Sequence, residues 1–110
     1  MIEVEAHIVI KRNGDTFLCP QKVKLLTEVQ KQGSLNAAAK VLGISYQHAW
    51  NLITELNRTG TEPLVTKQRG GSKGGGAALT TYGERLLNDY RSIGQTVNQL
   101  IAPINIEINL

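Results

Sequence analysis

The stretch that decides the fold spans residues 35–52 and reads LNAAAKVLGISYQHAWNL. Two helices that cross over a tight turn need a small residue where their backbones approach, and Ala39 supplies it. The turn needs a residue that can leave the right-handed helical region, and Gly43 can do so. Apolar side chains at four positions fill the space between the helices: Leu42, Ile44, Ala49 and Leu52. This spacing is typical of a DNA-binding helix-turn-helix over residues 35–57.

The second helix of this motif has one apolar and one polar side. On a helical wheel the apolar arc consists of Ala49, Leu52, Ile53 and Leu56, and the polar arc of Gln47, His48, Asn51 and Arg58. The amides of Gln47 and Asn51 can each pair bidentately with adenine in the major groove, so we predict that they read bases. The alternative is a solvated polar face on an ordinary helical hairpin.

Three other side chains of this helix have open roles. For His48, a phosphate contact or a plain surface position is favoured over reading of bases, and no second ligand beside it suggests a metal site. Arg58 is a candidate phosphate contact. Trp50 flanks the apolar arc, and packing against the wing or the first helix is favoured over contact with DNA.

The segments before the motif predict a hairpin and a helix. Apolar residues alternate from Ile2 to Ile10, which predicts a half-buried strand, and Asn13-Gly14 predicts a tight turn into a returning strand at 16–18. The N-terminal hairpin is thus expected over 1–19, followed by three helices over 20–58. The expected helix signals are Pro20 at the first start, Gly33 at its end, Asn36 as cap of a helix over 37–42, and Ser45 as cap of a helix reaching about residue 57.

Residues 64–80 predict a wing, a glycine-rich loop between two short strands at 64–66 and 77–79. Glycines allow a hairpin tip to approach a sugar–phosphate backbone, and Lys67, Arg69 and Lys73 are predicted phosphate contacts. A nucleotide-binding P-loop is excluded because it needs Gly-Lys-Ser/Thr before a helix, whereas here Lys73 follows Ser72 and precedes three glycines. A flexible linker remains as an alternative.

A long helix is predicted over 81–102, capped by Thr80 or Thr81. Its apolar residues recur every three or four positions, which is the spacing of helices packed side by side. We therefore predict a dimer interface at Leu86, Tyr90, Ile93, Val97 and Leu100. The alternative is a helix that folds back on its own core through Tyr82 and Leu86. After Pro103, alternating apolar residues make the tail a candidate strand.

Length and composition set limits on the class of protein. The 110 residues fit one domain, and the net charge of +3 equals the excess of basic residues within 58–80. A local basic stripe suits contact with phosphate, although a solvated loop would look the same. With no apolar run long enough for a membrane helix, no signal peptide and one cysteine, Cys19, we expect a cytoplasmic protein. The sequence suggests no catalytic residue, metal ligand or cofactor.

Several of these stretches resemble the DNA-binding domain of the molybdate-responsive regulators of the ModE family. They are GSLNAAA (33–39), GISY (43–46), AW (49–50), GGSKGGGA (70–77) and LTTYG (79–83), in matching order over about residues 18–90. The helix-turn-helix part alone is also similar to LysR-type regulators.

The resemblance implies a winged-helix dimer paired through its long terminal helix. It also implies that Tyr46, Gln47 and Asn51 lie on the recognition helix. We predict that Ser45 and Tyr46 read bases together with Gln47 and Asn51. Longer family members carry oxyanion-binding domains beyond this part, so no oxyanion site is expected within these 110 residues.

The sequence thus predicts an α+β, mainly helical fold: a winged helix-turn-helix with an N-terminal hairpin and a C-terminal dimerisation helix. The predicted function is sequence-specific binding of double-stranded DNA as a homodimer, in control of transcription. The alternative is a winged-helix module that binds proteins and has no affinity for DNA.

Overall fold

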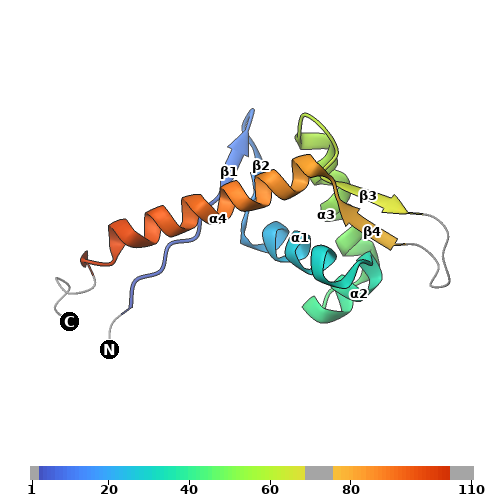
Figure 1. Ribbon diagram of the computed structural model, residues 1–110, viewed down its shortest axis with the longest axis horizontal. Helices are drawn as coiled ribbons and strands as arrows, with labels where there is room; N and C mark the ends of the chain where they lie inside the picture. The colour runs from blue at the N-terminus through green and yellow to red at the C-terminus, as the bar shows by residue number, and fades with distance from the viewer. Residues whose placement is uncertain (1–2, 69–75, 105–110) are drawn as a thin grey trace.

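The computed structural model describes residues 3–68 and 76–104, which form four helices and two small hairpins (Figure 1). In chain order the elements are β1 (Ile10–Arg12), β2 (Asp15–Leu18), α1 (Pro20–Gln32), α2 (Leu35–Leu42), α3 (Tyr46–Thr59), β3 (Val65–Gln68), β4 (Gly76–Leu79) and α4 (Thr81–Ile101). The predicted α+β, mainly helical class is confirmed. The candidate strand in the tail falls on residues 105–110, outside the described residues.

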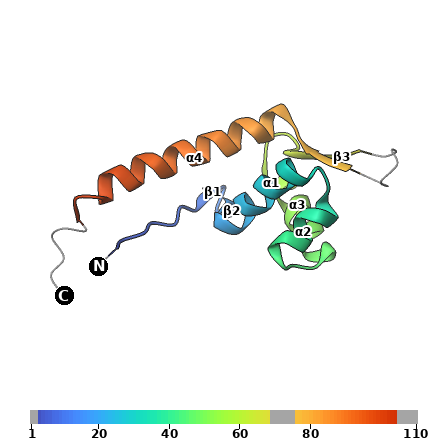
Figure 2. The ribbon, with the colours of Figure 1, turned by 60° about the horizontal axis from the view of Figure 1, so that its bottom comes forward.

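The N-terminal hairpin is shorter than its sequence predicts. The turn is as expected, since Asn13 and Gly14 both have positive φ, 51° and 85°. The predicted strand over 2–10 is wrong, because only Ile10–Arg12 pair with β2, and β2 has four residues. Alternation marks a half-buried extended chain, but a strand also needs a partner of equal length. Residues 3–9 instead run alongside α4 (Figures 1 and 2).

Local signals set the ends of α1 and α2. Pro20 opens α1, and Gly33 ends it in the left-handed region at φ 70°, with its N–H donating to the Val29 carbonyl. The cap of α2 is Ser34, whose hydroxyl accepts from the Ala37 N–H at 3.1 Å, so the predicted cap at Asn36 is wrong. Both side chains can cap a helix. Ser34 does so because it is extended directly after Gly33, which turns the chain out of α1.

The other two caps fix α3 and α4. Ser45 accepts from the His48 N–H at 3.0 Å, as predicted, and α3 continues to Thr59, beyond the expected end near 57. For α4 the cap is Thr80, whose hydroxyl accepts from the Gly83 N–H and donates to the Pro63 carbonyl at 2.7 Å. One threonine thus starts α4 and ties it to the segment before β3.

The core lies where α1, α2 and α3 meet, and it is almost entirely aliphatic. Its fully buried large side chains are Leu18, Leu25, Leu26, Leu56, Leu64, Leu87 and Val29. Ala38, Ala39 and Ala49 are also buried, and their small side chains let the helices approach closely. Leu87, from the start of α4, joins this core although the apolar repeat predicted for that helix did not include it.

Backbone hydrogen bonds and close backbone contacts attach the wing and α4 to this core. β3 and β4 pair antiparallel from Val65 opposite Leu79 to Gln68 opposite Gly76, and the Ala77 N–H donates to the Gly33 carbonyl at 3.0 Å. Gly83 lies so close to Leu64, the residue before β3, that a Cβ there would collide with its carbonyl oxygen. From this anchor α4 extends away from the three-helix body (Figure 2).

Candidate nucleic-acid interface

The turn between α2 and α3 has the geometry predicted for a helix-turn-helix. Gly43 is left-handed at φ 69°, and the following Ile44 N–H donates to the Ala39 carbonyl at 3.0 Å. Ala39 itself is 1% exposed at the crossing of the helices. Because Ser45, directly after this turn, caps α3, the turn sets the direction in which the first residues of α3 leave α2.

The outward face of α3 carries the predicted base-reading amides. Gln47 and Asn51 are exposed, and Gln47 Nε2 donates to Asn51 Oδ1 at 2.9 Å, one helical turn away. This bond keeps the two amides together while both remain accessible to bases in a groove. Thr54 continues the same face one turn on and is exposed, although the polar arc predicted from the sequence did not include it.

Ser45, Tyr46 and His48 lie around this amide pair. The Ser45 hydroxyl accepts the bond that caps α3, and the His48 ring Nε2 lies 3.1 Å from Gln21 Nε2 at the start of α1. Gln21 is exposed and adds an amide from α1 to the edge of this surface. Tyr46 is 46% exposed and contacts the wing.

Arg58 stands at the opposite end of α3. Its guanidinium lies 4.0 Å from the Asp15 carboxylate of the N-terminal hairpin, and both side chains are largely exposed. Arg12 also reaches this end and donates to the Thr59 carbonyl at 3.1 Å. Since exposed ion pairs are weak, Arg58 can leave Asp15 to bind phosphate.

A buried lysine holds α3 in position and was missed in the sequence. Lys22 of α1 is 4% exposed, donates to the Thr16 carbonyl at 3.0 Å, and pairs with Glu55 of α3 at 3.1 Å. A lysine is seldom buried unless it has such partners. The pair therefore fixes how α3 is rotated on α1, and so where its amide face points.

Asn57 connects α3 to the wing. Its Oδ1 accepts from the Leu64 and Val65 N–H groups at 2.8 and 3.2 Å, and its Nδ2 donates to the Val65 carbonyl at 3.0 Å. One amide side chain thus satisfies three backbone groups at the start of β3. The sequence analysis missed this role, because its only signal is an asparagine near the expected end of the helix.

Of the three basic residues predicted in the wing, Lys67 lies within the described residues, and Arg69 and Lys73 do not. Lys67, predicted to bind phosphate, has its Nζ 3.2 Å from the centroid of the Trp50 ring and 3.1 Å from Tyr46 Oη. Trp50 therefore contacts the wing, in agreement with the favoured interpretation of that residue. Arg69 and Lys73 lie outside the described residues, so their predicted phosphate contacts remain predictions.

The predicted interface residues of α4 fall into two groups. Leu86 and Tyr90 pack partly against the chain's own core, and the Tyr90 hydroxyl donates to the Ile8 carbonyl at 2.9 Å. Burial, with a smaller effect from Cys19, raises the pKa of the Tyr90 phenol, so it stays protonated as the donor.

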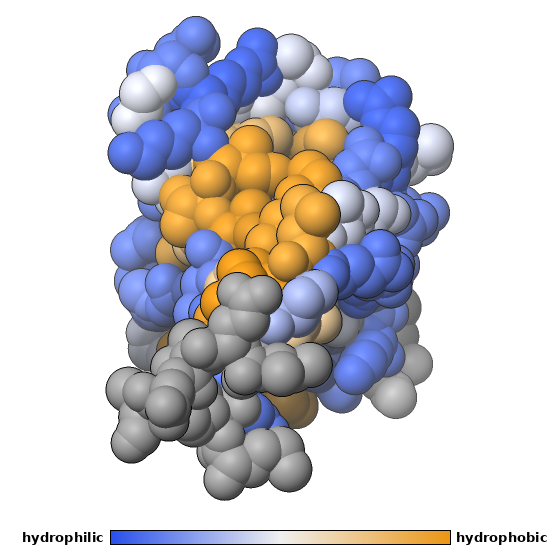
Figure 3. All heavy atoms as spheres, turned by 90° about the vertical axis from the view of Figure 1, so that its left-hand side faces the viewer, coloured by the Kyte–Doolittle hydropathy of each residue, from blue (hydrophilic) through white to orange (hydrophobic). Residues whose placement is uncertain are grey.

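The second group is exposed: Ile93 and Leu100 are 42% and 71% exposed, with Val97 half-buried between them. An apolar patch is visible at this end of the molecule (Figure 3).

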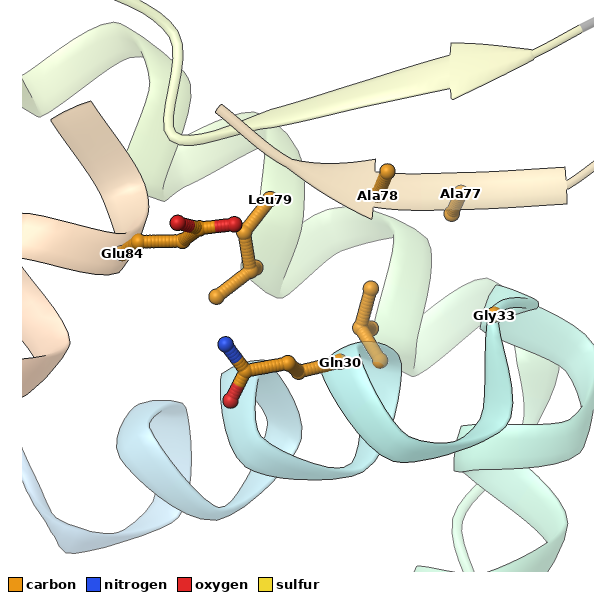
Figure 4. Close-up of a pocket in the computed structure, with 7 residues that line it drawn as sticks. Gln30, Gly33, Ala77, Ala78, Leu79 and Glu84 are labelled. Atoms are coloured by element: carbon orange, nitrogen blue, oxygen red, sulfur yellow. The ribbon is translucent and has the colours of Figure 1, made fainter. Parts of the chain in front are cut away.

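A shallow hollow of about 270 Å³ lies between α1, β4 and the start of α4 (Figure 4). Val29 and Leu79 line it with the polar ends of Gln30 and Glu84 at its rim. The residues described, 3–68 and 76–104, contain no cluster of three His, Cys, Asp or Glu side chains that could hold a metal ion. Among the same residues no helix is long and apolar enough to cross a membrane.

An exposed amide face on the second helix of a helix-turn-helix, with a two-stranded wing beside it, defines the winged helix-turn-helix class of DNA-binding domains. Residues 20–84 match the family described as "Bacterial regulatory helix-turn-helix protein, lysR family". The chain belongs to this family. It is accordingly a DNA-binding domain of a transcription regulator and not an enzyme, as the sequence predicts.

The resemblance to ModE regulators is also confirmed. The chain is 42% identical over 96 residues to the transcriptional regulator ModE of Haemophilus influenzae, covering 87% of this chain and 38% of the relative. It is 37% identical over 94 residues to the DNA-binding transcriptional dual regulator ModE of Escherichia coli, covering 86% and 36% of the two chains. The chain therefore spans a little over a third of the length of these relatives.

Solved structures support the same fold. The DNA complex of the CbnR DNA-binding domain aligns with a TM-score of 0.60 at 23% identity, covering 79% of this chain and 94% of that one. The DNA complex of MepR from Staphylococcus aureus gives 0.59 at 22% identity, covering 77% and 63%. Both identities are low, so these similarities bear on the fold alone.

Proposed function

We propose that this chain reads a specific sequence in double-stranded DNA as a homodimer, with α3 in the major groove and the wing on the sugar–phosphate backbone. The observation that carries the proposal is the exposed Gln47–Asn51 amide pair, held outward by an α3 whose other side is buried. Amides of this kind pair bidentately with adenine. Ser45, Tyr46 and His48 lie around this pair as further contacts, and Arg58 adds a phosphate contact at the other end of α3.

The wing supplies contacts that do not depend on sequence. Arg69 and Lys73 would bind phosphate, and removing either side chain should lower the slope of log affinity against log salt by about 0.9. The Arg69→Ala, Lys73→Ala double variant should therefore bind all duplexes more weakly and reduce that slope by about two. An unchanged slope would exclude the wing tip from the backbone.

The homodimer rests on the second half of α4. Ile93, Val97 and Leu100 recur at steps of four and three, so they share one side of the helix, and Ile104 is 43% exposed just beyond its end. A second copy, related by a twofold axis, would cover this row with the same row of its own helix. Pairing would present two copies of α3 to one face of the duplex, one helical turn apart.

The regulated genes are proposed to concern molybdenum. The relatives include a molybdenum transport protein ModE of Azotobacter vinelandii, 42% identical over 88 residues, and a molybdenum-pterin-binding protein MopB of Rhodobacter capsulatus, 36% identical over 103. Transcript profiles with and without this gene should differ most at genes for uptake and use of molybdenum. Changes confined to unrelated genes would contradict this assignment.

The experiment that tests DNA reading is selection of bound duplexes from a random pool. We expect one enriched motif that survives competition with scrambled DNA, and reduced enrichment for the Gln47→Ala, Asn51→Ala double variant. A folded protein that enriches no motif would contradict the proposal and favour a winged-helix module that binds other proteins.

A further inference from the structure

One lysine joins the wing to the recognition helix. Lys67 is the third residue of β3, and its Nζ lies 3.2 Å from the Trp50 ring centroid, 5.6 Å from that of Tyr46 and 3.1 Å from Tyr46 Oη. Tyr46 and Trp50 are one turn apart on α3. The ammonium group is therefore held by two aromatic residues of the helix that carries the base-reading amides.

This interaction differs from the anchors at the root of the wing. The Asn57 side chain bonds backbone groups at the start of β3, and the Ala77–Gly33 backbone hydrogen bond fixes β4 to the end of α1. Lys67 acts further along β3, toward the wing tip, and through its side chain alone. A cation within about 6 Å of an indole face is attracted by the negative face of the ring. The tyrosine hydroxyl takes one of the three ammonium donors.

We propose that Lys67 is a positioning residue that locks the wing to α3, so that the two DNA-reading elements meet the duplex as one rigid unit. The inference rests on the proposed DNA reading, and it replaces the predicted phosphate contact of Lys67. The angle between wing and helix sets which phosphates are within reach when Gln47 and Asn51 are on their bases. A loose wing would have to be ordered on binding, at a cost in affinity.

The Lys67–Trp50 interaction can be tested without DNA, because Trp50 is the only tryptophan of the chain. In Lys67→Met, which keeps the length of the side chain and removes its charge, Trp50 emission should shift and its quenching by acrylamide should rise. Lys67→Arg should resemble the wild type, since guanidinium also binds indole faces. Lys11→Met is the matched control, an exposed lysine of the other hairpin. Identical emission and quenching in Lys67→Met and wild type would overturn the interaction.

The role in DNA reading is tested by affinity as a function of salt on a selected duplex. Lys67→Met should bind about twofold to tenfold more weakly at every salt concentration with an unchanged slope, and Lys67→Arg should restore affinity. A slope lower by about 0.9 would make Lys67 a phosphate contact instead and overturn the positioning role.

A second variant separates positioning from general damage to the fold. Trp50→Leu should weaken binding by a similar factor, and the Lys67→Met, Trp50→Leu double variant should be no weaker than either single one. Fully additive effects would contradict a shared interaction. If the wild type bound no duplex at all, the proposed function and the positioning role would both fall, while the fluorescence result would still decide whether Lys67 lies on the Trp50 ring.

Discussion

Both halves of α4 carry apolar residues, but these have opposite surroundings. Leu87, in the first half, is 1% exposed and belongs to the core, whereas Leu100, in the second half, is 71% exposed. Leu86 and Tyr90 pack against the body, and Ile93 begins the exposed row. Among the described residues, 3–9 run alongside the second half of α4, beyond the three-helix body (Figures 1 and 2).

This difference shows that a periodic pattern identifies the face of a helix but not what covers it. The spacing of apolar residues predicted one continuous dimer interface, and the structure gives its first part to the chain's own core. The predicted alternative, a helix folded back on its own core, describes that first part. The proposed dimer therefore depends on the second half of α4, and each half can be disrupted separately.

The largest effect is expected from Val97→Glu in the second half. A charge in the proposed seam should abolish the dimer and, by removing simultaneous engagement of two half-sites, weaken operator binding about a thousandfold. Sedimentation would give the assembly, and titration of a labelled operator the affinity. Gln95→Glu, which adds the same charge at an exposed position of the same turn, should leave both unchanged.

Two results would contradict the role given to the second half. One is a wild-type protein that sediments as a monomer at micromolar concentration. The other is an undisturbed dimer in Val97→Glu. Circular dichroism of the variant should remain that of the wild type, since Val97 lies outside the core, and this excludes unfolding as the cause.

Gly83→Ala should be the most damaging substitution in the first half. A Cβ at this position collides with the Leu64 carbonyl, so the start of α4 must move away from Leu64, where the wing begins. Thermal or urea unfolding should show a decrease of about 3 kcal/mol in the free energy of unfolding, the upper part of the range for overpacked sites. A variant as stable as the wild type would contradict the close packing of α4 on the wing.

Gln47→Ala and Asn51→Ala should leave both fold and dimer intact and change only the reading of DNA. Each should cost about 1–3 kcal/mol on the selected duplex and much less on scrambled DNA. Asn98→Ala, which removes an exposed amide from α4, is the control and should change neither the affinity for the selected duplex nor that for scrambled DNA. Equal discrimination in wild type and both variants would exclude this amide pair as the base reader.

The smallest effect is expected from Gly94→Ala. Gly94 is helical, and the nearest atom to a Cβ there is Ile8 Cδ1 at 3.9 Å, an ordinary contact. Alanine should raise the free energy of unfolding by about 0.5–1 kcal/mol through helix propensity. Destabilisation measured in the same unfolding assay would mean that the N-terminal segment lies closer to α4 than the structure shows.

The elements that the sequence predicted well are those with local signals. Gly43, Ser45 and Asn13-Gly14 act on the backbone within a few residues, and the turns and caps they predict are present. The helix-turn-helix follows from such signals together with Ala39, because its two helices are adjacent in the chain. The outward amides followed from the wheel of a single helix.

Contacts between distant residues could not be predicted in the same way. The pair between buried Lys22 and part-exposed Glu55 and the Lys67–Trp50 interaction each join separate elements, and neither lysine differs in the sequence from one without such a partner. The extent of β1 depended on the length of β2. The division of α4 into a packed first half and an exposed second half depends on where the three-helix body ends, and the spacing of apolar residues does not indicate that point.

The central claim is that two copies of this chain read one duplex symmetrically, and the composition of the complex on a selected duplex tests it most directly. Sedimentation equilibrium or native mass spectrometry counts the chains, and the enriched motif gives the symmetry. We predict two chains per duplex and an inverted repeat whose half-sites lie about 34–36 Å apart, one helical turn. A single chain bound to one unrepeated site would contradict the account.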